Sequence, residues 1–297
     1  MAAGLITVAM WASAFVAIRA LAGTFSPGSI TIGRLLVGVV VLVAVARPRA
    51  LPVISRSDLL RVALFGVLWF GAYSVGLNAG EQEVDAGTAV LLVNLGPILI
   101  ALFAGVFLKE GISPQLVLGC VVAFLGTGLV AASSSDGGSV TSSTRGVALV
   151  LAATLAYGAA ATFQRRALRS VPAFWVNLLG MLAASAVCLP FAPGLARELS
   201  ATSPSQWVWL IYLGVFPTAI GFTTWAYALA RTSAGRTAAV NYLIPPLTIS
   251  LSWLVLGELP ALLAIVGGAI CVAGVVLARS KSLPWLPART LGGVRDR

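Results

Sequence analysis

The stretch AGTAVLLVNLGPILIALFAGVFLKEGISPQLVLGCVVAFLGTGLV, residues 86–130, has a counterpart in AGRTAAVNYLIPPLTISLSWLVLGELPALLAIVGGAICVAGVVL, residues 234–277. The two align without a gap at a constant shift of 148 positions, from 86 to 234. The residues that stand opposite an identical residue include Ala86 and Ala234, Gly87 and Gly235, Pro97 and Pro245, Glu110 and Glu258, Gly119 and Gly267, and Gly126 and Gly274. Chance rarely keeps such pairs in register, so the pattern indicates a long internal repeat.

Both copies of the repeat are almost wholly apolar, and so is most of the chain. The 297 residues are 59% hydrophobic and 9% charged, with a mean hydropathy of +1.00. So few charges cannot cover a water-soluble globule, which predicts a membrane protein surrounded by the lipid bilayer. A helix needs about 20 apolar residues to cross a bilayer, so the chain has room for about ten crossings. The expected spans are residues 2–21, 29–47, 57–78, 86–108, 114–133, 146–166, 171–191, 207–229, 235–256 and 261–279.

The expected spans divide into two equivalent sets of five. Because five is odd, the second set must enter the membrane from the opposite side. The predicted fold is therefore an all-α integral membrane protein with ten transmembrane helices in two inverted five-helix repeats. The expected domains are a first repeat at residues 1–133, a polar external linker at 134–145, a second repeat at 146–279 and a basic cytoplasmic tail at 280–297.

The net charge of +10 comes largely from basic residues in the short connections and the tail. This distribution is typical of membrane orientation signals and argues against nucleic acid as a partner. If the N-terminus lies inside, the inner connections hold most of the arginines, whereas the outer side holds Glu81, Glu83 and Asp85. Both termini are therefore predicted to be cytoplasmic, with the chain in the cell's inner (plasma) membrane.

Cysteine and histidine usage argues against a metal site or a cofactor. Histidine is absent, and Cys120, Cys188 and Cys271 all lie within apolar runs. A cysteine in such a run behaves as a small hydrophobic residue, so neither a disulfide nor a metal ion is expected. No catalytic residue, metal or cofactor is predicted.

Three segments resemble those of a known family, the EamA-type members of the drug/metabolite transporter superfamily. They are WASAFVAIRAL at residues 11–21, AGTAVLLVNLGPILIALFAGVFLKEGIS at 86–113, and GVFPTAIGFTTWAYALARTSAGRTAAVNYLIPPLTISLSWLVLGELP at 214–260. The resemblance covers nearly the whole chain and implies ten helices, two EamA domains and transport of amino acids, other metabolites or drugs. Lys109 departs from the family pattern, which often has Gly before the helix-end Glu. The first-helix motif has only a faint counterpart at residues 156–166.

Pro97 and Pro245 are expected near the middle of their spans, where each would free the carbonyl four residues earlier, those of Val93 and Asn241. Pro246 would likewise free the carbonyl of Tyr242. Unsatisfied backbone at mid-membrane is tolerated only beside protein or a water-filled cavity. These prolines, with Asn94, Asn241 and Tyr242, are therefore candidates for a substrate cavity, although kinks that only shape packing would explain them too.

The ninth span carries polar residues at helical spacing, namely Thr237, Asn241, Thr248 and Ser252. One polar face could line a water path, which we favour, or hydrogen-bond to neighbouring helices. Aromatic residues within spans, Trp11, Tyr73, Tyr157, Trp225 and Tyr227, could hold an organic substrate or could be core residues and interface anchors. Trp11, Trp225 and Tyr227 are preferred because they also lie in the family segments.

Arg34 and Arg19 are charges placed inside or near the ends of spans, where charge is expensive. Either could bind a carboxylate or phosphate, Arg34 better because it lies deeper. The simpler expectation, which we favour, is that both turn outward or pair with Glu81, Glu83 or Asp85.

Glu110 and Glu258 stand at equivalent helix ends and are candidate gate or helix-end residues. They could cap neighbouring helices, which is favoured, or form ion pairs that open and close. No acid is expected at mid-membrane, so facilitated transport or exchange has as much support as proton antiport. The glycines at seven-residue spacing predict close helix packing, within the chain or across a homodimer.

These features together predict a secondary transporter, an exporter of small organic solutes such as amino acids, metabolites or drugs, working by alternating access. A membrane-embedded lipid-modifying enzyme would need clustered nucleophiles or metal ligands, which the short basic connections do not offer. A non-transporting helper subunit would leave the mid-membrane prolines and the polar face unexplained.

Overall fold

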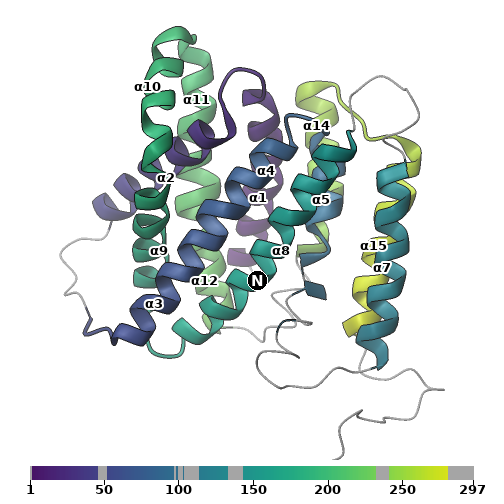
Figure 1. Ribbon diagram of the computed structural model, residues 1–297, viewed down its shortest axis with the longest axis horizontal. Helices are drawn as coiled ribbons and strands as arrows, with labels where there is room; N and C mark the ends of the chain where they lie inside the picture. The colour runs from purple at the N-terminus through teal and green to yellow at the C-terminus, as the bar shows by residue number, and fades with distance from the viewer. Residues whose placement is uncertain are drawn as a thin grey trace, which may run out of the picture.

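The computed structural model describes residues 2–45, 52–96, 98–99, 103, 114–132, 143–231 and 241–279. Over these residues it is built from helices and contains no strand (Figure 1). The predicted Pro97, Glu110 and Thr237, most of the linker and the basic tail lie outside the described residues. The all-α prediction is confirmed for the part of the chain described.

Six helical segments of the described chain are long and apolar enough to cross a membrane. They are α1 (Ala2–Leu21), α2 (Pro27–Val45), Arg56–Gly80, α8 (Thr144–Ala167), Ala173–Ala201 and Pro204–Ala228. Four further helices lie within the other expected spans: α5 (Ala86–Val93), α7 (Pro114–Ala132), α14 (Ile244–Leu256) and α15 (Leu262–Arg279). The helices lie where apolar runs predicted them, while the total of ten crossings stays a prediction.

Two of the long segments are interrupted by π-helical turns. Arg56–Gly80 consists of α3 (Arg56–Phe65), the π-helix η1 (Gly66–Tyr73) and α4 (Ser74–Gly80). Pro204–Ala228 consists of α11 (Pro204–Leu213), the π-helix η3 (Gly214–Gly221) and most of α12 (Phe222–Arg231). The wider π-turns shift side chains from the positions they would have in a regular α-helix. They often occur at functional sites.

The prediction for Pro245 is wrong in one respect, because this proline begins a helix instead of kinking one. Helix α5 already ends at Val93, with Asn94 as its C-cap. On the other side a 3-10 turn, η4 (Asn241–Leu243), precedes α14, and Pro245 lies in the first turn of α14. A proline at a helix start removes no internal hydrogen bond. The break also interrupts the polar face predicted for the ninth span.

The region expected to be an outer connection after the seventh span is helical. α9 (Ala173–Cys188) continues through the 3-10 turn η2 (Leu189–Phe191) into α10 (Ala192–Ala201), which contains Arg197. Phe191 packs on Gly28 at the start of α2, where an added Cβ would come within 2.4 Å of the ring. The chain thus stays helical beyond the expected span at residues 171–191, and it packs there against the start of α2.

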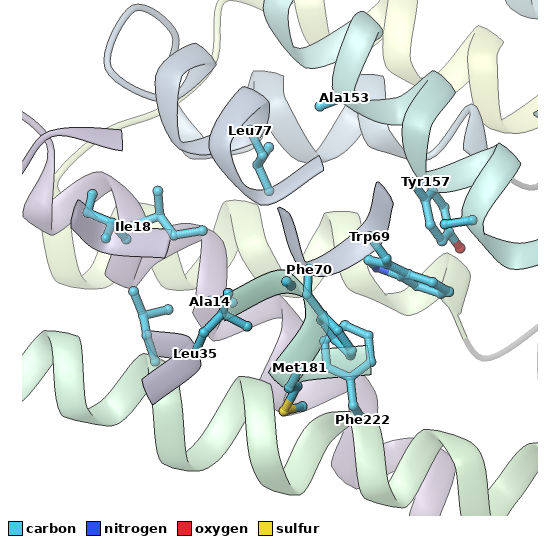
Figure 2. Packing of buried hydrophobic residues seen from close by; sticks show 14 of the residues in the cluster. Ala14, Ile18, Leu35, Trp69, Phe70, Leu77, Ala153, Tyr157, Met181 and Phe222 are labelled. Carbon is cyan, nitrogen blue, oxygen red and sulfur yellow. The ribbon is translucent and has the colours of Figure 1, made fainter. Parts of the chain in front are cut away.

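The buried core joins helices from both ends of the chain (Figure 2). The Phe70 ring centroid lies 4.7 Å from that of Phe222, and Trp69 lies 4.6 Å from Tyr157. Edge-to-face pairs of this kind contribute about 0.5–1.5 kcal/mol beyond area burial. They fix the π-helix η1 against α8 and α12.

Helices α7 and α15 form a pair at one side of the molecule (Figure 1). A Cβ added at Gly126 would meet the Gly267 carbonyl oxygen at 2.5 Å, and one at Gly274 would meet the Gly119 carbonyl oxygen at 2.7 Å. The glycines therefore permit close packing of two helices within the chain, which is one of the two alternatives predicted for them. Because Gly119 faces Gly274 and Gly126 faces Gly267, the two helices run antiparallel.

Contacts between helix ends define two ends of the bundle. At the acidic end, the connection after α1 meets the start of α11 through Thr24 and Gln206, and the connection after α4 meets the start of α8 through Glu83 and Ser143. This end carries the acids Glu81, Glu83, Asp85, Glu198 and Glu258. At the basic end lie the start of α3 and the end of α8, with Arg56, Arg165 and Arg166.

Candidate functional site

A cavity of about 90 Å³ lies between the two halves of the chain. A buried water needs roughly 10–15 Å³ measured in this way, so the cavity has room for several. Its walls come from α1, α2, η1, α4, α5, α8, α12, η4 and α14. The lining residues are Trp11, Ala14, Phe15, Ile18, Arg34, Trp69, Tyr73, Ser74, Leu77, Val90, Val93, Asn94, Tyr157, Phe222, Asn241 and Ile244.

Helix α1 presents one face to the cavity, because its lining residues recur at three- and four-residue steps from Trp11 to Ile18. The Trp11 ring centroid lies 5.2 Å from that of Phe222 and 5.2 Å from that of Trp225. Its indole N–H has no acceptor among the described residues. Trp11 is therefore held by ring contacts alone, with a hydrogen-bond donor left over on a cavity wall.

Arg34 is 7% exposed and lines the cavity from α2. Its Nε donates to Thr218 Oγ1 at 2.8 Å. The Thr218 hydroxyl in turn donates to the Leu213 carbonyl at 2.7 Å, five residues earlier, a reach that suits the π-helix η3. The expectation that Arg34 turns outward or pairs with Glu81, Glu83 or Asp85 is wrong: no acid of the described chain lies within ion-pair distance of it. The cavity wall thus holds a cation that is in ion-pair contact with none of the described acids.

Helix α5 ends at the cavity and helix α14 begins there. Val93 and Asn94 line it from the C-terminal end of α5, and Asn241 and Ile244 line it just before and at the start of α14. The C-terminal end of a helix carries partial negative charge and the N-terminal end partial positive charge. The cavity therefore offers fields of both signs from the backbone.

Other predicted residues lie away from the cavity wall. Trp225 is 9% exposed and packs behind Trp11, Pro245 is buried in the first turn of α14, and Tyr227 is 52% exposed. Tyr242 belongs to η4, with its side chain outside the described part. The Thr248 hydroxyl donates to the Ala12 carbonyl at 3.3 Å, so this member of the polar face bonds to a neighbouring helix instead of lining the cavity.

Sequence reasoning missed several lining residues, above all Trp69, Ser74 and Phe222. Tyr73 and Tyr157 were named among the aromatics but not preferred, and both line the cavity. An apolar run identifies a span but not the face that turns inward. The π-helix η1, which places Trp69 and Tyr73, leaves no periodic signal in so apolar a sequence.

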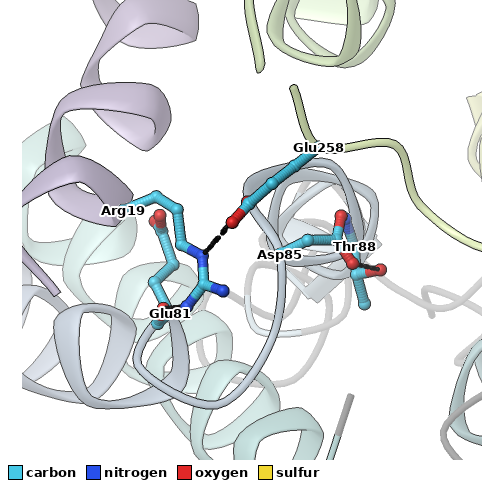
Figure 3. Close-up of polar contacts among 5 residues, drawn as sticks. All are labelled: Arg19, Glu81, Asp85, Thr88 and Glu258. Carbon is cyan, nitrogen blue, oxygen red and sulfur yellow. Dashed lines mark hydrogen bonds and ion pairs between the residues drawn. The ribbon is translucent and has the colours of Figure 1, made fainter. Parts of the chain in front are cut away.

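Three residues at the acidic end lie next to the cavity lining, since Arg19 follows Ile18 in the chain, and we call them the roof: Arg19, Glu81 and Glu258 (Figure 3). Arg19 Nε lies 3.0 Å from Glu258 Oε1, and its Nη1 donates to the Glu81 backbone carbonyl at 2.9 Å. Glu258 follows Gly257, whose φ of 69° ends α14 in the left-handed conformation. Glu258 thus forms an ion pair with Arg19, the less favoured of the two expectations for this residue. Asp85 is the acid that caps a helix here, since it accepts from the Thr88 N–H at 2.8 Å.

The model of the EamA-like transporter family matches residues 1–132 and 144–280. A probable terminal-alkyne amino-acid exporter of Streptantibioticus cattleyicolor is 34% identical over 278 residues, covering 94% of this chain and 92% of that protein. The uncharacterized transporter YdfC of Bacillus subtilis is 32% identical over 271 residues, covering 90% and 87%.

A solved crystal structure of another protein shares the fold, with a TM-score of 0.63 at 22% identity, over 93% of this chain and 95% of that chain. The family match, the relatives named as transporters and the apolar helices agree with one another. The chain is a multi-pass membrane transporter and belongs to the EamA-like transporter family.

Proposed function

We propose that this protein exports small organic solutes, amino acids foremost, by alternating access between two inverted repeats of five transmembrane helices. The observation that carries the proposal is Arg34, a buried cation on the wall of a cavity between the two halves that forms no ion pair with any acid of the described chain. A charge in this position is costly unless a partner neutralises it. A solute carboxylate is such a partner, and an arginine fork suits its planar geometry.

The broken helices support recognition of a zwitterion. The N-terminal end of α14 attracts a carboxylate and the C-terminal end of α5 attracts an ammonium group. Asn94 and Asn241 add amide donors and acceptors, and the rings of Trp11, Trp69 and Tyr157 offer apolar surface to a side chain. The name of the Streptantibioticus relative, an amino-acid exporter, supports the same solute class and direction.

The antiparallel pair α7 and α15 supports inversion of the halves. These helices are equivalent under the shift of 148 positions, yet they run in opposite directions. The two family matches, one in each half, agree with a division into two repeats joined by a linker near residues 134–145.

In the proposed cycle the cavity opens to one side at a time. The roof closes the acidic end, which is the outer end if both termini are cytoplasmic, as the arginines at the basic end favour. Glu110, equivalent to Glu258, would close the inner end in the other half of the cycle. Closure by an ion pair between halves fits rocking of one half against the other.

The decisive measurement is solute flux in proteoliposomes containing the purified protein. The panel includes neutral amino acids, their amides without the carboxylate, nucleobases and cationic drugs, each with and without a pH gradient. We expect counterflow of amino acids and none of their amides. Absence of flux for every compound in well-folded vesicles contradicts a transport function, and equal flux of acid and amide contradicts carboxylate recognition at Arg34.

A further inference from the structure

Glu81 is a buried acid that the proposed solute site does not use. It directly follows α4, and its side chain is fully buried. Neither carboxylate oxygen has a hydrogen-bond partner among the described residues. The other acids of the same connection are satisfied, since Glu83 pairs with Arg145 and Asp85 accepts from Thr88. Such a carboxylate is expensive as an anion and much less so as a neutral acid.

Charged and titratable groups from four directions face Glu81. They are Arg19 on α1, Arg34 on α2, Tyr73 on η1 and, at the acidic end, Asp85 and Glu258. The nearest cation is already engaged, because Arg19 Nε contacts both Glu258 oxygens at 3.0 and 3.1 Å. Burial raises the pKa of Glu81 well above its usual range, against the opposing effect of Arg19.

Glu81 also lies between the cavity and the acidic end. Leu77, four residues earlier on the same helix face, lines the cavity, as does Ile18 beside Arg19. Because this ion pair joins the first half of the chain to the second, moving the two halves apart at this end would separate Arg19 from Glu258. That separation frees the Arg19 guanidinium next to the unpartnered carboxyl of Glu81 (Figure 3).

We propose that Glu81 is the proton-binding site of the outer gate: it holds a proton while Arg19 and Glu258 are joined, and it releases the proton and takes Arg19 as its partner when they separate. The inference rests on the alternating access of the proposed function. One proton leaves Glu81 on opening and one returns on closing, and no other bond changes. In each state Arg19 has one carboxylate partner, and Glu81 is either a neutral acid or an anion paired with Arg19.

Linkage sets the direction of the pH effect. A group whose pKa is raised in the closed state stabilises that state when it is protonated. Acid on the outer side therefore favours closure, by up to about tenfold per pH unit between the ordinary and the raised pKa.

The test measures how often the roof opens when no solute is present. In the full chain with its three cysteines replaced by alanine, Leu77→Cys reports opening, because Leu77 is 3% exposed when the roof is closed. Its labelling by a membrane-impermeant maleimide is compared between variants at one pH at a time, so that the pH dependence of the thiol reaction cancels. At about pH 8, Glu81→Gln is expected to label about tenfold more slowly than its parent, and at about pH 5 the two rates converge.

Matched variants complete the experiment. Glu83→Gln, in the same connection but with its own arginine partner, is expected to label like the parent at both pH values. Glu81→Asp keeps the titrating carboxyl and should keep the pH dependence. Equal rates for Glu81→Gln and parent at the higher pH, or a difference of the same size at both pH values, overturns the proposal. Amino-acid counterflow in the same vesicles tests transport separately, so a failure there leaves the labelling result interpretable.

Discussion

Arg34 shows how much of this protein depends on the orientation of a single side chain. Its depth in α2 is visible in the sequence, but its direction depends on Thr218, which lies 184 positions away along the chain. That hydroxyl is oriented by its own bond to Leu213 within η3. The π-helix of one half thus holds the cation of the other half at the cavity.

Replacing Arg34 by Gln is expected to raise KM for amino-acid transport by about tenfold or more. The change removes the charged hydrogen bonds between the guanidinium and the solute carboxylate, and hydrogen bonds to charged groups contribute about 1.5–3 kcal/mol. The glutamine amide can still donate to Thr218, so the side chain is expected to keep its place on the cavity wall. The measurement is counterflow over a range of solute concentrations. Arg145→Gln is the control, because the Arg145 side chain is 81% exposed at the acidic end. An unchanged KM for the Arg34 variant would place the carboxylate elsewhere.

At the scale of helices, close approach of α7 and α15 depends on glycine. Neither helix lines the cavity, and their contact includes a hydrogen bond from the Cys271 thiol to the Ala123 carbonyl at 3.3 Å. Without a hydrophobic driving force in lipid, helices associate through close packing, which small residues permit.

Gly126→Ala is expected to lower the free energy of unfolding in detergent by about 1–3 kcal/mol, because the new Cβ would overpack the contact. Its position lies 2.5 Å from the Gly267 carbonyl oxygen. Gly128→Ala is the control on the same helix, since a Cβ there meets nothing within 4 Å. Thermal or denaturant unfolding compares the two; equal stability would contradict the packing role of Gly126.

The limits of sequence-based prediction also lie at this scale. Apolar runs of about 20 residues locate the helices because membrane thickness imposes that length. The runs do not reveal that Pro245 begins a helix instead of kinking one, since proline is compatible with both. They do not reveal η1 either, because π-turns occur without a distinct apolar period, and Trp69 was missed for that reason. The Arg19–Glu258 pair joins residues 239 positions apart, beyond the reach of local patterns.

For the whole molecule, the distribution of charge between the two ends predicts orientation. A fluorescent protein that folds only in the cytoplasm should be bright when fused after Arg297. Alkaline phosphatase, active only outside, should be active when fused within residues 134–145 and inactive at the C-terminus. The reverse pattern would turn the acidic end inward and exchange the roles proposed for the two ends.

The contact between α7 and α15 has a consequence for how each half of the chain could pair on its own. Gly126 meets Gly267, and under the shift of 148 positions the same contact becomes that of Gly274 with Gly119, which is also present. Each half therefore carries both sides of one self-complementary surface, as the subunits of a two-fold symmetric dimer do. A half-length polypeptide that carries this surface is expected to pair with a second copy of itself running in the opposite direction.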